Sequence, residues 1–387
     1  DVAFSVLRHP TVASKRFLIT IGDRTVGGLS HRDPMVGPWQ VPVADCAVTL
    51  ADYAGFRGEA MSMGERTPLA ALDAPASGRM AVGEAITNLL AAPIELPRIK
   101  LSANWMAACG EPGEDAALYD TVQAVGMDLC PALGIGIPVG KDSLSMRTKW
   151  RDDGVDKQVT APVSLVITAF ATLADVRGTL TPQVQPGETT LVLVDLGQGR
   201  NRMAGSMLAQ VIGQFGDVCP DVDDPAQLKA LVAAINQLRG EGQLLAYHDR
   251  SDGGLWAAAC EMAFAGQLGL SLNVDLLVTE GDGISDSRAE VGDSKNWAGQ
   301  IGERRNELTL KALFNEELGV VIQVPRAERD AVIGVLRQHG LSRHSHVIGT
   351  TNDRGVVEVW RDAKLQFSTP LRDLQQAWDG VSWRIAQ

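Results

Sequence analysis

Four oxygen-bearing side chains in this sequence have the types and surroundings of ligands for a hard divalent cation. They are Asp45, Glu84, Asn88 and Asp249. Mg²⁺ takes few carboxylate and amide oxygens from a protein and completes its shell with water and phosphate. The histidines and cysteines, by contrast, do not cluster at zinc-like spacing. The oxygen set therefore predicts a magnesium site.

Three of these residues also have a plainer interpretation. Asp45 stands inside an apolar stretch, where a charge is costly unless it is satisfied. It either caps a turn or pairs with an arginine, or it binds a metal. Glu84 and Asn88 are four residues apart in a helix-like stretch, so both lie on one face. That face is either solvated or part of a site, and its apolar neighbours weaken the first interpretation.

The segment Tyr247–Gly254, Tyr-His-Asp-Arg-Ser-Asp-Gly-Gly, is dense in polar residues and glycine. It connects a strand-like run to a helix-like run, so Ser251 and Asp252 could cap the helix. Exposed amides at a helix start also suit phosphate oxygens. The plain alternative is a capped turn, but the density of such residues favours a binding site.

The segment Gly134–Ser143 resembles a phosphate-binding loop only superficially. Gly134 and Gly140 are six residues apart rather than five, and Asp142 occupies the position where Ser or Thr would bind magnesium. Pro138 also blocks the required backbone geometry. We expect a strand that ends in a glycine turn.

The charge balance limits the kinds of partner. The 387 residues carry a net charge of −12, which argues against a nucleic-acid binder. A carboxylate about 4 Å from a phosphate costs roughly 4 kcal/mol, so an acidic protein that binds nucleotides usually interposes divalent cations. The five cysteines are scattered and form no CxxC pair, as expected for reduced thiols in the cytoplasm. The sequence has no membrane-length apolar run and no secretory leader, and its start at Asp1 suggests a piece of a longer chain.

Apolar periodicity predicts two domains, residues 1–180 and 188–387, separated by a Pro- and Gly-rich boundary at Thr181–Glu188. We expect strands at 17–21, 41–50, 99–105, 137–139, 163–172, 190–195, 244–248 and 320–324. Helices are expected at 79–92, 114–133, 204–215, 225–238, 255–265 and 308–318.

Residues 280–308 are polar, rich in Gly, Ser and Asp, and lack apolar periodicity. This composition predicts a mobile, dispensable insertion. We expect limited proteolysis to cut there first.

Several segments resemble the second synthetase half of the large formylglycinamidine ribonucleotide synthetases. The likeness runs from near residue 10 to the C-terminus, and long runs in the same order make it specific. The segments are 22–28, 32–48, 58–66, 81–88, 100–106, 138–146, 248–255 and 314–319.

The resemblance implies an α/β N-terminal domain like that of aminoimidazole ribonucleotide synthetase, followed by its C-terminal-type α+β domain. It implies a carbon–nitrogen ligase of purine biosynthesis, which converts formylglycinamide ribonucleotide with ATP and ammonia from glutamine. The family's core has two such halves related by pseudo-twofold symmetry. The second half carries an auxiliary nucleotide, ATP or ADP, with Mg²⁺.

The resemblance also implies roles for individual residues, although it assigns no catalytic residue in this chain. Ala44 and Ser251 would touch the nucleotide, Lys15 would contact phosphate, and Lys141 with Asp142 would lie near the nucleotide or the shared cleft. The magnesium ligands would be Asp45, Glu84, Asn88 and Asp249.

Three parts of the family's enzyme are absent from this sequence: the N-terminal domain, the first synthetase half and the glutaminase domain. No cysteine here has a nucleophile-elbow context. We therefore expect a chain that binds nucleotide without making product, and that could pair with itself through the surface meant for its twin.

The alternatives to a catalytic half are a structural nucleotide-binding half and another enzyme of the same superfamily, such as a selenophosphate or thiamine-monophosphate kinase. Trp39 and the segment Gly140–Ser143 disfavour the kinase.

Overall fold

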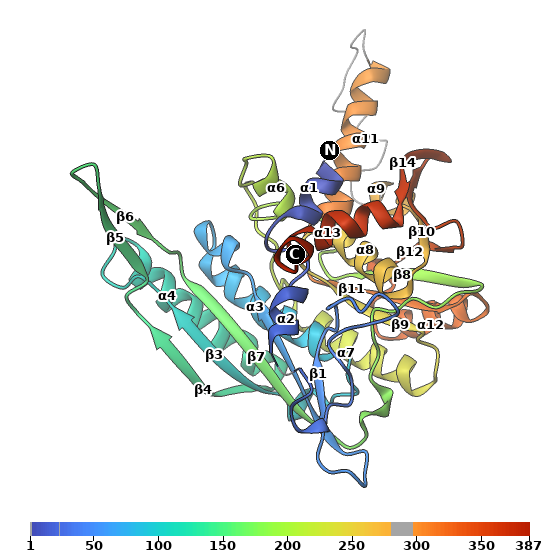
Figure 1. The fold of residues 1–387 in the computed structure, drawn as a ribbon, viewed down its shortest axis with the longest axis horizontal. Coiled ribbons are helices and arrows are strands. Elements are labelled where there is room, and N and C mark those ends of the chain that lie inside the picture. The colour runs from blue at the N-terminus through green and yellow to red at the C-terminus, as the bar shows by residue number, and fades with distance from the viewer. Residues whose placement is uncertain (1, 23, 280–296) are drawn as a thin grey trace.

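The computed structural model describes residues 2–22, 24–279 and 297–387 (Figure 1). The described residues form a five-stranded sheet from the first part of the chain, a seven-stranded sheet from the second part, and a separate two-stranded hairpin. Helices pack on both sheets, so the molecule consists of two mixed α/β units (Figure 1).

The first sheet has the strand order β1-β2-β7-β3-β4, and only β3 and β4 are parallel. One face is covered by helix α3, which approaches β2 most closely at Gly64. A Cβ there would lie 2.2 Å from the Ala81 carbonyl oxygen. The strands are β1 (Ala47–Leu50), β2 (Gly58–Glu65), β3 (Lys100–Met106), β4 (Gly136–Ser143) and β7 (Ser164–Leu173).

Helix α3 starts where the sequence provides a cap. The Asp73 side chain accepts from the Ala76 amide, and a proline occupies the first turn. The helices of this part are α1 (Val2–Arg8), α2 (Arg16–Ile21), α3 (Ala74–Leu89), α4 (Glu114–Gln123) and α5 (Cys130–Leu133). The short helical turns are η1 (Val26–Gly28), η2 (Thr67–Ala71), η3 (Leu96–Arg98), η4 (Ala124–Leu129) and η5 (Val176–Gly178).

The second sheet has the strand order β14-β13-β10-β12-β8-β11-β9, which leaves β9 at an edge. Every residue of the interior strand β8 is buried, because helices cover both faces. The strands are β8 (Thr189–Asp195), β9 (Ala246–Arg250), β10 (Gly269–Asn273), β11 (Gly319–Pro325), β12 (Ser345–Asn352), β13 (Val356–Arg361) and β14 (Lys364–Pro370).

The second sheet's helices belong to two cores. Val192 and Ile322 face α3 and α7 in a core shared with the first sheet, whereas Leu193 and Val321 face α8 and α13 in the other. The helices are α6 (Met207–Val211), α7 (Pro225–Gly240), α8 (Gly254–Gly266), α9 (Asp275–Thr279), α11 (Trp297–Phe314), α12 (Arg329–Gln338) and α13 (Leu371–Ile385). The short turns are η6 (Arg326–Glu328) and η7 (Ser342–His344). The shared core joins the two units.

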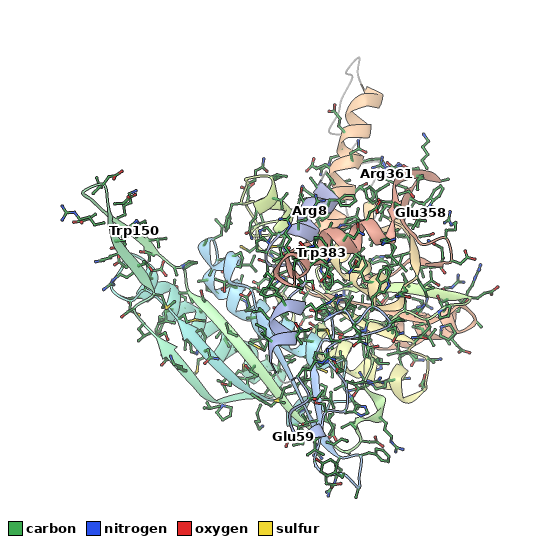
Figure 2. The ribbon with its side chains drawn as sticks, in the orientation of Figure 1. Arg8, Glu59, Trp150, Glu358, Arg361 and Trp383 are labelled. Carbon is green, nitrogen blue, oxygen red and sulfur yellow. The ribbon has the colours of Figure 1, made fainter. Side chains whose placement is uncertain are left out.

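An exposed hairpin projects from the first unit and was not predicted. Its strands are β5 (Arg147–Asp152) and β6 (Val155–Thr160) (Figure 1). Trp150 lies on it, 46% exposed and far from the second unit (Figure 2).

Three predicted strands and helices differ from the structure in type or extent. Residues 17–21 are helical, in α2, because a short apolar run cannot by itself separate strand from helix. The strand expected at 41–50 begins only at Ala47, after Pro42 and Asp45. The helix expected at 204–215 is reduced to α6, because Ser206 caps it at one end and Gly213 adopts φ +71° beyond the other.

The predicted loop 280–308 is wrong from residue 297, where α11 begins. Its remainder, 280–296, lies outside the described residues.

Two further predictions concern the state of the cysteines and the presence of a membrane-spanning helix. All five cysteines are free, and four of them are buried. Among the described helices, none is both long enough and apolar enough to cross a membrane.

Candidate functional site

Three side chains meet where strand β9 lies against the loop before β1. Potential ligand atoms of Asp45, His248 and Asp249 all lie within 4.8 Å of one another. The Asp45 carboxylate accepts through Oδ1 from His248 Nδ1 at 2.7 Å and from the Asp249 amide at 3.1 Å. Because β9 is an edge strand, that amide has no partner strand, and Asp45 satisfies it.

The other oxygen of each aspartate is left without a partner. Asp45 Oδ2 and Asp249 Oδ2 are both buried and make no hydrogen bond to the described residues. An unsatisfied buried acceptor costs about 1–3 kcal/mol, and more if it is charged. Burial, together with the Asp45 carboxylate, raises the pKa of Asp249 to about 8. Two orphaned carboxylate oxygens that repel each other fit a divalent cation that prefers oxygen ligands.

Helix α3 brings Glu84 and Asn88 to the same place. The close approach at Gly64 lets Glu84 Oε2 accept from the Glu65 amide at 2.7 Å, while Asn88 Nδ2 donates to the Met63 carbonyl at 3.1 Å. Both side chains therefore face strand β2, which confirms that they share one face of the helix. With its nitrogen committed, Asn88 has its amide oxygen to offer a cation.

Glu84 lies within the electrostatic reach of Asp249. Burial raises the pKa of Glu84 well above its ordinary value, the nearby Arg66 guanidinium opposes this, and Asp252 and Asp249 add to it. The structure thus places Asp45 and Asp249 side by side, with Glu84 within electrostatic reach of Asp249 and Asn88 one helical turn beyond Glu84 on the same face of α3.

A buried arginine balances part of this negative charge. The Arg66 guanidinium contacts Glu316 Oε2 at 2.7 Å and Asp252 Oδ1 at 3.6 Å. The other oxygen of Glu316 accepts from the amides of Met207 and Gly253, each at 2.8 Å. Arg66 therefore connects the end of β2 to the turn before α8.

That turn differs from its prediction. Gly253, with φ +83°, precedes α8 as its N-cap, and neither Ser251 nor Asp252 caps the helix through its side chain. A Cβ at Gly254 would lie 2.5 Å from the Asn315 carbonyl oxygen, which explains the glycine there. The Gly253 and Gly254 amides are bonded to Glu316 and to the Ser251 carbonyl, so neither is free to bind phosphate.

The predicted nucleotide contacts separate into two groups. Ala44 and Ser251 lie within two residues of the aspartate ligands in sequence. Lys15 lies near two other acids: burial lowers its pKa, while Glu261 and Asp252 oppose that shift. Lys15 donates to the carbonyls of Thr11 and Ala13. Lys141, by contrast, is exposed on β4, at the opposite edge of the first sheet from β1. Strand spacing puts these edges about 19 Å apart, so Lys141 does not join the group.

Comparison with known protein families divides the chain into two parts, as the two sheets do. Residues 14–172 match the FGAR-AT PurM_N-like domain, and residues 187–362 match the AIR synthase related protein, C-terminal domain. The chain carries two AIR synthase-type domains in tandem. This confirms the predicted fold class, an aminoimidazole ribonucleotide synthetase-like N-terminal domain followed by its C-terminal-type domain.

Solved structures share the fold at low sequence identity. PurL of Thermotoga maritima complexed with FGAR is 14% identical, has a TM-score of 0.65, and matches 97% of this chain but 52% of its own. Phosphoribosylformylglycinamidine synthase II of T. maritima is 15% identical, with a TM-score of 0.64, and the match again covers 97% of this chain and 52% of the other. HypE in the HypE–HypF complex is 15% identical, with a TM-score of 0.53. The chain spans about half the length of the PurL structures that it matches.

Three further residues of the candidate site received no role from the sequence. His248 and Arg66 stand inside segments that the family likeness quotes, but nothing in their spacing assigns a partner. Glu261 is a lone acid in the otherwise apolar helix α8. A charge in such a helix needs a partner, and this signal could have identified it.

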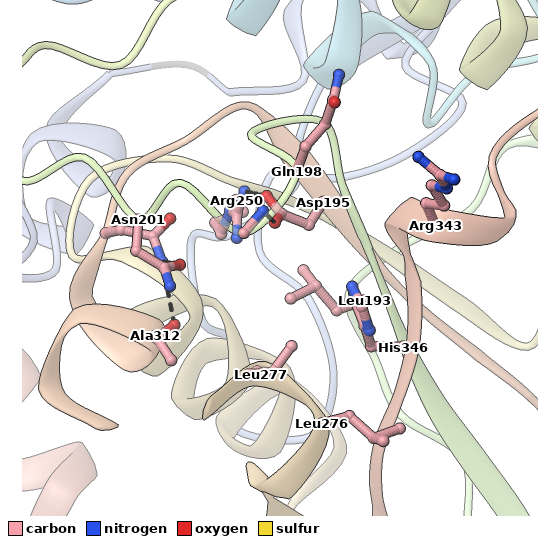
Figure 3. A pocket seen from close by; sticks show the side chains of 12 residues that line it. Leu193, Asp195, Gln198, Asn201, Arg250, Leu276, Leu277, Ala312, Arg343 and His346 are labelled. Atoms are coloured by element: carbon pink, nitrogen blue, oxygen red, sulfur yellow. Dashed lines mark hydrogen bonds and ion pairs between the residues drawn. The ribbon is translucent and has the colours of Figure 1, made fainter. Parts of the chain in front are cut away.

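A separate cavity lies beyond Arg250, on the second sheet. It is lined by residues such as Asp195, Arg250, Asn315 and His346 (Figure 3). Its volume is about 30 Å³, which is room for about one or two waters. The cavity is therefore too small for a nucleotide.

Proposed function

We propose that this chain is the second synthetase half of a phosphoribosylformylglycinamidine synthase, which uses ATP and glutamine to convert formylglycinamide ribonucleotide. Within it, Asp45, Glu84, Asn88 and Asp249 hold Mg²⁺ that bridges to ATP or ADP. One observation carries the metal proposal: two buried carboxylate oxygens, on Asp45 and Asp249, have no partner among the described residues, and Glu84 lies within electrostatic reach of Asp249. When bound, Mg²⁺ would offset their repulsion and accept phosphate oxygens.

The comparisons support the enzyme class without deciding it. The first family model carries the FGAR-AT name, and similar PurL structures were solved with ATP, ADP, AMPPCP and FGAR. Identities of 14–15% support the fold alone, and HypE matches as well. We propose that the domain boundary lies at Thr181–Glu188. This segment follows the end of the first family match, at residue 172, and overlaps the start of the second, at residue 187.

Around the metal, Ala44, Ser251 and Lys15 are the proposed nucleotide contacts. Lys15 is the proposed contact for phosphate, because its ammonium group is positively charged and already lies among acids and carbonyl oxygens. Lys141 remains a prediction for a different part of the cleft, because the first sheet separates it from the aspartates.

A structural role for the nucleotide is the second candidate, and the burial of the ligands favours it. The side chains of Asp45 and Asp249 are 0% and 5% exposed, at a junction that both domains help to build. A buried site at a junction suits a nucleotide that stays bound and holds the domains together. Nucleotide turnover by the chain would distinguish the two roles.

We also propose that the uncovered face of the first sheet binds a partner, either the first synthetase half or a second copy of this chain. Met63, Thr168, Ser102 and Val139 form one row across β2, β7, β3 and β4 on the face opposite α3. Met63 is 59% and Val139 61% exposed, and Phe170 lies on the same face. Exposed apolar patches of this kind mark interaction surfaces.

Calorimetry tests the metal proposal directly. We expect ADP to bind with Mg²⁺ and to bind far more weakly in EDTA. Asp45→Asn and Asp249→Asn should each weaken binding by roughly 1 kcal/mol or more, since each removes a charged ligand. The control is Asp330→Asn, whose side chain is 86% exposed. Equal affinity with and without EDTA would refute the metal bridge.

Two further measurements test the enzyme and partner proposals. We expect no ammonia-dependent phosphate release with formylglycinamide ribonucleotide, because half a cleft cannot align the reactants. Turnover of about 1 per second or more would show that this half is catalytic alone. Light scattering should give a dimer mass that Phe170→Glu reduces and Met127→Glu, at an exposed position off the sheet, does not. A strictly monomeric wild type would remove self-pairing.

A further inference from the structure

His248 is a buried histidine whose two ring nitrogens both contact carboxylates. Nδ1 lies 2.7 Å from Asp45 Oδ1, and Nε2 lies 2.9 Å from Glu261 Oε2. The side chain is 7% exposed, so water does not compete for either nitrogen. Each ring nitrogen is therefore committed to a carboxylate oxygen of the protein. A ring held at both nitrogens leaves neither free to bind a metal.

This geometry separates His248 from its neighbours in the cluster. Asp45 and Asp249 each have a buried oxygen without a partner, whereas both nitrogens of His248 are committed. Proximity alone would make the histidine a third ligand, since its nitrogen lies with the aspartate oxygens. To bind a cation it would have to give up the Asp45 contact, and Asp45 would lose its strongest partner.

The second carboxylate fixes the ring and is itself fixed. Glu261 lies on α8, and its other oxygen, Oε1, accepts from Trp378 Nε1 at 3.2 Å. Trp378 is 2% exposed, lies on α13, and also donates to the Val12 carbonyl at 2.9 Å. Helices α8 and α13 therefore hold Glu261, Glu261 holds the ring, and the ring holds Asp45.

We propose that His248 is a positioning residue rather than a ligand of the metal site. It fixes the Asp45 carboxylate through Oδ1 and leaves Oδ2 as the atom offered to the cation. This inference rests on the proposed metal–nucleotide site and adds the device that orients one of its ligands. Partners of this kind typically change metal affinity by about 10- to 100-fold when they are lost.

Mn²⁺ in place of Mg²⁺ makes the first test spectroscopic and requires no variant. The wild-type chain is loaded with Mn²⁺ and ADP, with either natural-abundance or ¹⁵N-labelled histidine, and examined by electron spin-echo envelope modulation. We expect no coupling from a directly bound histidine nitrogen. A coupling that changes with ¹⁵N-histidine would identify a histidine ligand and overturn the inference, while the metal site itself would stand.

Variants supply the second test through Mn²⁺ affinity, measured by the free-ion resonance. His248→Leu should weaken binding about 10- to 100-fold, and His248→Asn, which keeps a donor near the Nδ1 position, should recover most of it. His344→Leu is the matched control, because His344 is also a buried histidine, at 5% exposure, but lies in the turn η7 before β12. It should leave the affinity unchanged.

The outcomes are distinguishable. Unchanged affinity in His248→Leu, or equal loss in His248→Leu and His248→Asn, overturns the positioning role. A wild type that binds no Mn²⁺ overturns the proposed site and this inference together. Thermal unfolding of each variant identifies one that does not fold, and the wild-type spectrum then decides alone.

Discussion

Replacing Arg66 with methionine tests whether the acidic junction depends on its buried cation. The Arg66 side chain is 3% exposed and contacts Glu316, which is 1% exposed, at 2.7 Å. Methionine keeps an unbranched apolar stem but removes the charge. Glu316 cannot turn to water, because its Oε1 accepts from the Met207 and Gly253 amides.

The expected loss follows from which groups remain buried. Removing one partner of a buried ion pair typically costs about 3–5 kcal/mol, and Glu316 keeps its full burial after the change. Asp252 adds less, because its contact with Arg66 is 3.6 Å long and its side chain is 23% exposed. We therefore expect Arg66→Met to lower the free energy of unfolding by about 3–5 kcal/mol.

A double-mutant cycle isolates the pair. Arg66→Met with Glu316→Gln should be destabilised by about 0.5–3 kcal/mol less than the sum of the single variants. Chemical denaturation followed by tryptophan fluorescence and by circular dichroism measures each free energy, with coincidence of the two signals as the check on a single transition. The control is Arg177→Met, which breaks an exposed pair with Asp175 and should lose much less.

The pH dependence has a definite sign. Burial raises the pKa of Glu316 to about 7, and the Arg66 guanidinium opposes this rise. Without Arg66 the pKa rises further. A carboxyl whose pKa is higher in the folded state stabilises the protein at low pH and loses that contribution as the pH rises through the folded value. The penalty of Arg66→Met should therefore be larger at about pH 8 than at about pH 6. A penalty that is small and independent of pH would refute this account.

Three further perturbations test the packing around the site. Gly64→Ala places a Cβ within 2.2 Å of the α3 backbone. We therefore expect it to lower the free energy of unfolding by about 1–3 kcal/mol or more and to weaken Mg²⁺–ADP binding in calorimetry. The control Gly334→Ala, in open space on α12, should change neither. Tyr247→Phe removes a buried 2.6 Å hydrogen bond to a carbonyl of α3 and should cost about 1–3 kcal/mol in unfolding experiments. Iodoacetamide should modify the partly exposed Cys109 before Cys46, because burial raises the pKa of Cys46 to about 12; equal rates would contradict the buried-thiol interpretation.

The shared face of Glu84 and Asn88 on helix α3 could be predicted from spacing alone. A separation of four residues puts Glu84 and Asn88 on one face whatever the helix packs against. Asp45 was different, because its apolar surroundings left a metal, a turn and an arginine partner equally consistent. Its actual partners, His248 Nδ1 and the Asp249 amide, belong to a strand some 200 residues away, and only the fold brings them together.

The secondary-structure predictions that were wrong or missing also have local causes. Residues 302–308 are mostly polar because this part of α11 is largely half-buried or exposed, and composition alone does not separate an exposed helix from a loop. The β5–β6 hairpin lacks apolar alternation because both of its faces meet solvent. Its turn did carry a signal: Asp153 and Gly154 have φ of +50° and +78°, the conformation that Asp-Gly favours in tight hairpins.

The distribution of charge at the junction shows which charges the proposed cation would offset. The Arg66 guanidinium offsets the negative charges of Glu316 and Asp252. The His248 ring lies between the carboxylates of Asp45 and Glu261. Both internal donors are then fully committed, and neither contacts the remaining oxygen of Asp45 or Asp249. A charge placed there binds the loop before β1 and strand β9 at once, so it must stabilise the joined arrangement by linkage, about 2.7 kcal/mol at a hundredfold excess over Kd. Metal binding and the docking of the two AIR synthase-type domains are therefore expected to be one equilibrium rather than two.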